Sequence, residues 1–168
     1  MSQPKEIFVV MSRCTACKSC EIACAVEHSE SKNLYVAISE RPAPKSRVYV
    51  EWAAPDGKVP IVCRHCEDAP CVHACISGAI SRDDAGVVIT DKDKCIGCWT
   101  CVMVCPYGVI GRCLEERKAY RCDRCPDREI PACVSSCPTQ ALVYQTVDSF
   151  SRDARKDVAG EMLAGEGG

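Results

Sequence analysis

The chain has 168 residues, which is enough for one ordinary domain or two small ones, and its formal charge of −2 by itself indicates no particular partner. Apolar residues make up 47 % of the chain, but this figure includes 17 cysteines, and only 5 % of the residues are aromatic, so cross-links must help to hold the fold. No segment approaches the roughly 18 consecutive apolar residues of a membrane-spanning helix, which excludes a direct membrane span.

The cross-links are either disulfides or bonds to metal. The first residues, "MSQPKEIFVVMSRC", lack the basic start and long apolar run of a secretory signal, so we expect a cytoplasmic protein. That compartment is usually too reducing for disulfides. The number of cysteines is also odd, and both observations favour metal over a disulfide scaffold.

The N-terminal part contains one short strand and the first group of cysteines. "EIFVVM" is a β-rich run, and it precedes "CTACKSCEIAC", whose spacing is C-x2-C-x2-C-x3-C. This spacing is typical of bacterial ferredoxins, which bind 4Fe–4S clusters. The first group consists of Cys14, Cys17, Cys20 and Cys24.

A long insertion, residues 28–60, follows the first group. Within it, "RVYVEW" and "KVPIVC" flank "AAPDG" and predict a β-hairpin, and "ERPAPKS" predicts a polar, Pro-containing loop. Long insertions in compact domains tend to be functional. We therefore interpret residues 28–60 as a partner-docking segment rather than a purely structural cover.

The second group, within "CRHCEDAPCVHAC", has a middle spacer of four residues, and the third, within "CIGCWTCVMVCP", has the spacing of the first. "GAISRDDAGVVIT" lies between them and predicts a hairpin with its turn at Asp83 to Gly86. Trp99 replaces no cysteine, so we interpret it as an apolar cover. The two groups consist of Cys63, Cys66, Cys71 and Cys75, and of Cys95, Cys98, Cys101 and Cys105.

The third and fourth groups are joined by a segment in which "GVIG" and "KAYRC" can pair across "RCLEER". Cys113 lies in this segment, outside every group, and we interpret it as a free, partly buried thiol that is not a ligand. The fourth group, within "CDRCPDREIPACVSSCP", has a middle spacer of seven residues. It consists of Cys122, Cys125, Cys133 and Cys137.

The chain ends in a strand and a helical tail. "ALVYQTV" is β-rich, and we expect it to pair with "EIFVVM". Beyond it, Ser149 is in place to cap a short helix, and the final Gly-rich residues should be frayed. Phe150, Val158, Met162 and Leu163 can pack on the protein or on a partner, and the sequence does not decide between these two.

The three histidines lie within or just after cysteine groups. His65 and His73 are inside the second group, where they are in place to hydrogen-bond cluster sulfur, and His28 follows the first group. We expect each of them either at the polar surface or beside the metal ligands.

The spacing also predicts how many clusters the protein holds. Three closely spaced thiolates can surround one 4Fe–4S cluster, and the fourth cysteine of a group ligates the neighbouring cluster, so four groups predict four 4Fe–4S clusters in two pairs. Zinc prefers two C-x2-C pairs separated by a longer spacer, so a zinc-stabilised scaffold is the distant alternative. Spacing alone leaves the pairing of groups open, whereas the terminal strands favour the first with the fourth and the second with the third.

These features predict an α+β fold of two bacterial-ferredoxin-like modules, built from short β-hairpins and helical turns around four 4Fe–4S clusters. We place one module at residues 1–27 and 111–147 and the other at 61–110. The insertion at 28–60 and a C-terminal helix or tail at 148–168 complete the chain. Because the clusters take the place of side-chain packing, we expect the apoprotein to be largely unfolded.

The motifs "CRHCEDAPCVHAC", "CIGCWTCVMVCPYG" and "CDRCPDREIPACVSSCPTQAL" resemble those of the four-cluster iron–sulfur subunits of the dimethyl sulfoxide reductase type, over residues 5–147. "CEIACAVEHSESKN" and "ERPAPKSRVYVEW" are most similar to the CooF-type ferredoxin-like electron-transfer subunit of carbon monoxide dehydrogenase systems. The resemblance implies four ligand sets. Cluster 1 takes Cys14, Cys17, Cys20 and Cys137, and cluster 2 takes Cys122, Cys125, Cys133 and Cys24. Cluster 3 takes Cys63, Cys66, Cys71 and Cys105, and cluster 4 takes Cys95, Cys98, Cys101 and Cys75.

The sequence contains no G-x-G-x-x-G, no flavin signature and no Ser-His-Asp arrangement, so we expect an electron-transfer subunit without a catalytic site of its own. The resemblance implies low-potential electron transfer from carbon monoxide dehydrogenase to a hydrogenase, ferredoxin or flavin oxidoreductase, in anaerobic metabolism. The alternative is an electron-transfer subunit of a formate or molybdopterin oxidoreductase, or of a hydrogenase. We expect no nucleic-acid partner, and contact with the cytoplasmic membrane only through a partner protein.

Overall fold

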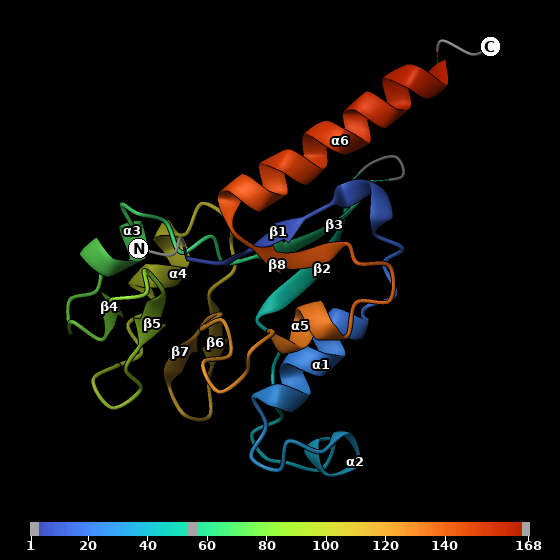
Figure 1. The fold of residues 1–168 in the computed structure, drawn as a ribbon. Helices are drawn as coiled ribbons and strands as arrows, with labels where there is room; N and C mark the ends of the chain where they lie inside the picture. The colour runs from blue at the N-terminus through green and yellow to red at the C-terminus, as the bar shows by residue number, and fades with distance from the viewer. Residues whose placement is uncertain (1–3, 54–56, 166–168) are drawn as a thin grey trace.

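The computed structural model describes residues 4–53 and 57–165, which form two-stranded sheets with short helices between them (Figure 1). This mixture of small helices and strands fits a ferredoxin-like fold. The strands are β1 (Glu6–Val9), β2 (Val48–Ala53), β3 (Gly57–Val62), β4 (Ile80–Arg82), β5 (Val88–Thr90), β6 (Gly111–Cys113), β7 (Lys118–Tyr120) and β8 (Leu142–Gln145). The helices are the 3-10 helix η1 (Met11–Arg13), α1 (Ser19–Glu27), α2 (Leu34–Ala37), α3 (Pro70–His73), α4 (Thr100–Val104), α5 (Ala132–Ser135) and α6 (Val147–Gly165).

An antiparallel strand pair joins the two ends of the chain. β1 pairs with β8 in a register that sets Ile7 opposite Tyr144 and Val9 opposite Leu142, which confirms the pair expected from the sequence. Ile7 and Leu142 are buried. Because β1 precedes the first cysteine group and β8 follows the fourth, this pair brings the two groups together, and α1 lies against α5 (Figure 1).

The insertion contributes a hairpin and a short helix. β2 and β3 are antiparallel, as predicted, and Val48, Val50 and Val62 are buried because every second side chain of a strand points to the same face. The middle of the predicted turn, 54–56, lies outside the described residues. α2 lies beyond the C-terminal end of α1 (Figure 1), and the Asn33 side chain caps it by accepting hydrogen bonds from two backbone N–H groups.

Two further hairpins follow in the middle of the chain. β4 pairs with β5 around the predicted turn, and Val88 is fully buried. β6 pairs with β7, but the strand begins only at Gly111, the last residue of "GVIG". The reason is that Val109 is buried in the apolar core around Leu142, whereas Ile110 is buried in a second apolar core around Val88. These two side chains therefore fill the space between two cores, which we call the first and second apolar cores.

The β6–β7 hairpin packs against the second apolar core. Ala119 is buried there beside Cys101, and the Ala119 N–H donates to Cys95 Sγ over 3.5 Å. The sequence assigned residues 111–147 to the module of the first and fourth groups. Ala119 has its apolar neighbours among the residues around the second and third groups, and the division into modules stays a prediction.

The C-terminal tail is one helix of 19 residues, longer than the short helix predicted (Figure 1). Ser149 does not cap it, because α6 begins at Val147 and the Ser149 N–H donates to Thr146 Oγ1 over 3.3 Å. Phe150 stacks on Phe8 of β1, with ring centroids 4.3 Å apart. This residue therefore packs on the protein itself.

The outer turns of α6 project away from the rest of the molecule (Figure 1). Val158, Met162 and Leu163 are exposed on these turns. Residues 166–168, for which fraying was predicted, lie outside the described residues. Within the part of the chain that the structure describes, no helix combines the length and the apolar character that crossing a membrane requires.

Candidate metal centres

The cysteine loops repeat one backbone geometry. The second residue after the first cysteine of each group has a positive φ: these residues are Ala16, His65, Gly97 and Arg124. In three of the loops the N–H of this residue donates to the first sulfur, over 3.5 Å to Cys14 and 3.4 Å to both Cys63 and Cys122. The sequence pattern C-x2-C thus folds the backbone around its first thiol.

Two further features of the loops depend on a left-handed backbone. At Gly97, with φ of +69°, an added Cβ atom would lie 2.4 Å from the carbonyl oxygen of Arg117, so only glycine fits.

The turn after the last cysteine of the second, third and fourth groups also repeats. Gly78, Gly108 and Gln140 have positive φ there, and each donates its N–H to the carbonyl oxygen of the cysteine three residues earlier.

Two sets of four thiols each line a small cavity. One cavity is lined by Cys14, Cys17, Cys20 and Cys137. The other is lined by Cys75, Cys95, Cys98 and Cys101. Each set combines three cysteines of one group with the last cysteine of another, as the family resemblance implies for clusters 1 and 4.

The second set of thiols, expected for cluster 2, is buried where α1 meets α5. Burial raises the pKa of Cys133, and the neighbouring thiols of Cys122, Cys24 and Cys125 raise it further. Burial and the nearby thiols of Cys63 and Cys24 likewise raise the pKa of Cys122, against the effect of a hydrogen bond from the Arg124 backbone. Cys24 therefore lies close to Cys122 and Cys133 of the fourth group, and its place in cluster 2 stays a prediction.

The third set, expected for cluster 3, lies around Arg121. Cys63 and Cys71 are buried, and their sulfurs accept hydrogen bonds from the Arg121 guanidinium. Cys66 and Cys105 pack against the second apolar core, which contains Cys71. The assignment of each thiol to a cluster remains a prediction.

The donors fit an iron–sulfur cluster. All seventeen cysteines are free, so no disulfide competes for the thiols. Backbone N–H groups donate to six of the grouped sulfurs, and such bonds favour the thiolate that a metal requires, because a charged acceptor gains more from them than a neutral thiol. The six are Cys14, Cys24, Cys63, Cys95, Cys122 and Cys137.

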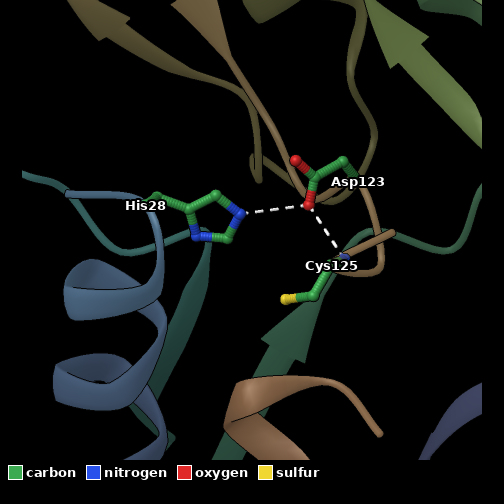
Figure 2. Close-up of side chains that lie close together, drawn as sticks. All are labelled: His28, Asp123 and Cys125. Carbon is green, nitrogen blue, oxygen red and sulfur yellow. Dashed lines mark hydrogen bonds and ion pairs between the residues drawn. The ribbon is translucent and has the colours of Figure 1, made fainter. Parts of the chain in front are cut away.

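Asp123, inside the fourth group, connects the insertion to the second set of thiols. Figure 2 shows its carboxylate between His28 and Cys125: Oδ1 lies 3.1 Å from His28 Nε2 and accepts the Cys125 N–H over 3.0 Å. Arg47 of the insertion donates to the other carboxylate oxygen, and the Arg47 backbone N–H donates to Cys24 Sγ over 3.2 Å. One carboxylate thus holds three segments of the chain together.

The charges of His28, Arg47 and Asp123 stabilise one another. Burial opposes ionisation, but the hydrogen bond from His28 and the charge of Arg47 hold the pKa of Asp123 well below its ordinary value. The hydrogen bonds to Asp123 and Cys24 outweigh burial in the same way and raise the pKa of His28 to about 9. Ligand atoms of His28, Asp123 and Cys125 lie within 4.8 Å of one another, a spacing that a metal ion would also need. Because two of the three already form an ion pair, we interpret them as a clamp beside Cys24 and Cys125.

The other two histidines occupy the two kinds of position expected for them. His73 is exposed and pairs with Asp68. His65 is buried beside Cys63, and its Nδ1 accepts the Val88 N–H over 3.0 Å. Burial, together with the charges of nearby arginines, lowers the pKa of His65 to about 3, so its ring is neutral.

Cys113 and Trp99 lie where the sequence suggested. Cys113 is buried in β6, its Sγ lies 3.5 Å from Glu115 Oε2, and it lines neither of the two thiol cavities. Trp99 packs against the second apolar core, as an apolar cover should. The sequence reasoning missed Arg121 and Asp123, although both flank Cys122; a charged residue beside a ligand cysteine is the signal that was available.

Comparison with known proteins gives matches over all four cysteine groups. The family model of the 4Fe-4S dicluster domain matches residues 57–147, and that of a 4Fe-4S binding domain matches residues 11–27. The chain is 40 % identical over 172 residues to the electron transport protein HydN of Escherichia coli, which covers 91 % of this chain and 96 % of HydN. It is 38 % identical over 169 residues to an iron-sulfur protein of Rhodospirillum rubrum, covering 89 % and 87 % of the two chains.

A third relative is the B subunit of the anaerobic dimethyl sulfoxide reductase of Escherichia coli, 36 % identical over 162 residues, with 86 % of this chain and 75 % of that protein covered. The family match and these relatives agree with the grouped thiols and their hydrogen-bond donors. The chain therefore belongs to the 4Fe–4S dicluster family, and it is an electron-transfer protein that works through bound 4Fe–4S clusters.

Proposed function

We propose that the protein binds four 4Fe–4S clusters and relays low-potential electrons from carbon monoxide dehydrogenase to a hydrogenase, a ferredoxin or a flavin oxidoreductase. The observation that carries the proposal is the grouping of free thiols from distant motifs around shared cavities. When bound, a 4Fe–4S cluster takes up and releases one electron at a time. The residues of the chain hold the clusters, set their surroundings and present the two ends of the series to partners.

We number each set of thiols after the cluster expected in it, and we infer that the four sets form one series in the order 1, 2, 3, 4. Cys20 of the first set lies near Cys133 of the second, and Cys122 of the second lies near Cys63 of the third. α3, which carries a cysteine of the third set, lies against α4, which carries one of the fourth. These neighbours support a linear arrangement over a branched one.

Both ends of this series lie near the surface. Cys17 of the first set and Cys98 of the fourth are exposed, whereas all the other cysteines are buried or partly buried. Electron transfer falls steeply with distance, so a partner must approach an end group closely. We infer that the donor docks over one of these thiols and the acceptor over the other.

We infer that the insertion, residues 28–60, provides an additional docking surface. Leu34, Tyr35, Val36 and Ile38 are all exposed, Tyr35 by 83 %. Exposed apolar side chains gathered in this way mark an interaction site. The clamp at Asp123 ties the same segment to the second set of thiols, so docking there would place a partner beside cluster 2.

The second candidate is an electron-transfer subunit of a formate or molybdopterin oxidoreductase, or of a hydrogenase. The likeness to the B subunit of a dimethyl sulfoxide reductase favours a reductase complex of this kind. The carbon monoxide dehydrogenase proposal is supported by "CEIACAVEHSESKN" and "ERPAPKSRVYVEW". Under both proposals the protein is cytoplasmic and meets the membrane only through its partner.

Iron and sulfide analysis of anaerobically prepared protein, with EPR of the dithionite-reduced sample, tests the cluster count. We expect about sixteen irons per chain and coupled spectra from paired clusters. Zinc in their place, or far fewer irons without a reducible signal, would contradict the proposal.

Rapid mixing with reduced donors tests the partner. Carbon monoxide dehydrogenase reduced by carbon monoxide should bleach the visible absorption of the protein faster than formate dehydrogenase reduced by formate; the reverse order would favour the second candidate. Changing both Tyr35 and Ile38 to serine should lower the rate of reduction by the faster of the two donors and leave the rate of reduction by dithionite unchanged. Met162→Ser, on the outer part of α6, is the matched control for an exposed apolar side chain.

A further inference from the structure

Arg121 is a buried cation in the middle of the molecule. It lies between β7 and Cys122, and only 4 % of the residue is exposed. Its Nη2 donates to Cys63 Sγ over 2.9 Å and its Nη1 to Cys71 Sγ over 3.0 Å. A guanidinium presents its N–H groups in a fixed fork, so it addresses both sulfurs at once.

The two sulfurs are the partners that compensate this charge. Among residues 4–53 and 57–165, Arg121 Nε has no hydrogen-bond partner and the guanidinium forms no ion pair with a carboxylate. A charge that is buried without an opposite charge is strongly unfavourable. Neutral thiols would not compensate the positive charge of Arg121, whereas the negative charge of thiolates bound to a cluster would. Arg121 is therefore arranged for the metal-bound form of the protein.

The other three sets have no such donor. In the part of the chain that the structure describes, their sulfurs receive hydrogen bonds from backbone N–H groups, from hydroxyl groups and from His28, but from no arginine or lysine side chain. Among the described residues, His28 is the one ionisable basic side chain that contacts a sulfur of these three sets: its Nδ1 lies 3.7 Å from Cys24 Sγ. Its charge is already balanced by Asp123, at 3.1 Å.

A second arginine adds positive charge beside the same set. Arg82 Nη2 donates to the carbonyl oxygens of His65 and Cys66, within the loop that carries the first thiols of this set. Among the residues that the structure describes, neither Arg82 nor Arg121 forms an ion pair with a carboxylate. Two arginines therefore act on this set: Arg121 bonds two of its sulfurs, and Arg82 bonds the backbone of its loop.

We propose that Arg121 is a tuning residue that makes cluster 3, held by Cys63, Cys66, Cys71 and Cys105, the most easily reduced cluster of the series. The inference rests on the ligand sets of the proposed function. Each added electron makes a site more negative by one charge, so a fixed cation hydrogen-bonded to two of its sulfurs stabilises the reduced form more than the oxidised form. The first electron to enter the protein then resides on cluster 3, next to Cys122 of cluster 2 and away from the exposed thiols at the two ends of the series.

An EPR-monitored redox titration of the anaerobic holoprotein tests this inference. In Arg121→Gln, the highest of the four midpoint potentials should move to a lower value while the other three stay in place. Arg121→Lys keeps the charge but loses the two-pronged geometry, so it should give a smaller shift in the same direction. Arg155→Gln removes the same charge from an exposed position of α6 and should leave all four midpoints unchanged.

Two further measurements tie the effect to the cluster and to the contact. Cys66→Ser changes a ligand of the third set and should alter the same EPR signal that Arg121→Gln shifts. In wild-type protein labelled with 15N-arginine, pulsed EPR of that signal should show a nitrogen coupling that disappears in Arg121→Lys. This measurement needs no Arg121→Gln protein, so it holds even where that variant fails to take up iron.

Three results would overturn the inference: unchanged midpoints in Arg121→Gln with full iron content, an equal shift of all four midpoints, or no 15N-arginine coupling in the signal of highest potential. A wild-type preparation with fewer than four reducible clusters would instead contradict the proposed function, and the iron and sulfide analysis identifies that case separately.

Discussion

Phe8 and Phe150 stack face to face, with ring centroids 4.3 Å apart and ring planes 8° from parallel. Phe8 belongs to β1, which pairs with β8, and Phe150 belongs to the first turn of α6, which follows β8. The stack therefore fixes the base of a helix whose outer turns project from the molecule. It also connects the tail to the strand that precedes the first cysteine group.

Phe150→Ala should lower the free energy of unfolding by about 1–2 kcal/mol, because an aromatic pair and part of a half-buried ring are lost. Thermal unfolding of the holoprotein, followed by circular dichroism, should show a midpoint lower by about 2–4 °C for each kcal/mol. Met162→Ala removes a side chain that is 67 % exposed and serves as the control. Equal midpoints for the two variants would show that the stack contributes nothing.

Removing the metal should unfold most of the protein. Five of the eleven buried residues of the first apolar core are cysteines: Cys20, Cys24, Cys63, Cys122 and Cys133. Without clusters, these thiols no longer cross-link distant segments, and the remaining apolar side chains are too few to replace them. Anaerobic chelation of all the iron should therefore abolish the native circular dichroism spectrum. A native spectrum in iron-free protein would refute this expectation.

Gly97→Ala should disrupt the loop of the third group. The new methyl group would lie 2.4 Å from the Arg117 carbonyl oxygen, so the backbone has to move and the thiols beside it move as well. We expect loss of iron from cluster 4 and a preparation with markedly less than full iron content. Gly108→Ala is the matched control: its φ is +63° but its Cβ would meet nothing within 4 Å, so it should cost only about 1–2 kcal/mol and keep its iron.

Asp123→Asn should loosen the insertion. The change removes the negative charge that Arg47 and His28 share, and a half-buried pair of this kind contributes about 1–3 kcal/mol. Limited proteolysis should then cut the segment from 28 to 47 faster than in the wild type. Asp127→Asn changes a carboxylate that is 83 % exposed and should leave the cleavage rate as it was; the prediction fails if both variants are cleaved alike.

Cys113→Ser should keep all the iron and all the EPR signals. Cys113 lies in β6 beside Glu115, and it lines neither of the two cavities that thiols share. Cys71→Ser, by contrast, changes a thiol of the third set and should lower the iron content. Iron loss in Cys113→Ser would mean that this residue is a ligand after all.

The features that the sequence predicted well are local. The β4–β5 hairpin depends on Asp83, whose side chain accepts the Val87 N–H, and on Gly86, whose φ is +77°, and both residues are visible in the pattern "RDDAGVV". The cysteine spacing likewise determines a local contact in three of the four loops, because the ligand and its hydrogen-bond donor are two residues apart. Neighbours in the sequence determine such features.

The features that the sequence did not predict depend on distant contacts. Ser149 has the side chain of a cap, but α6 begins earlier because Thr146 caps it and Phe150 meets Phe8 at the other end of the chain. Arg47 and Asp123 are separated by 76 positions, and no local pattern links them. The hydrogen bonds of Arg121 to its two thiols span 50 and 58 positions. Such pairs become visible only when the fold brings them together.

Dioxygen has access to the same two thiols that a redox partner can approach, Cys17 and Cys98. Cys24, Cys122 and Cys133, in the interior, are shielded by the protein around them. Oxidative damage in air should therefore begin at both ends of the series and reach its middle last. A partner protein bound over an end would act as a shield there, so the protein within its complex should survive exposure to air longer than the protein alone.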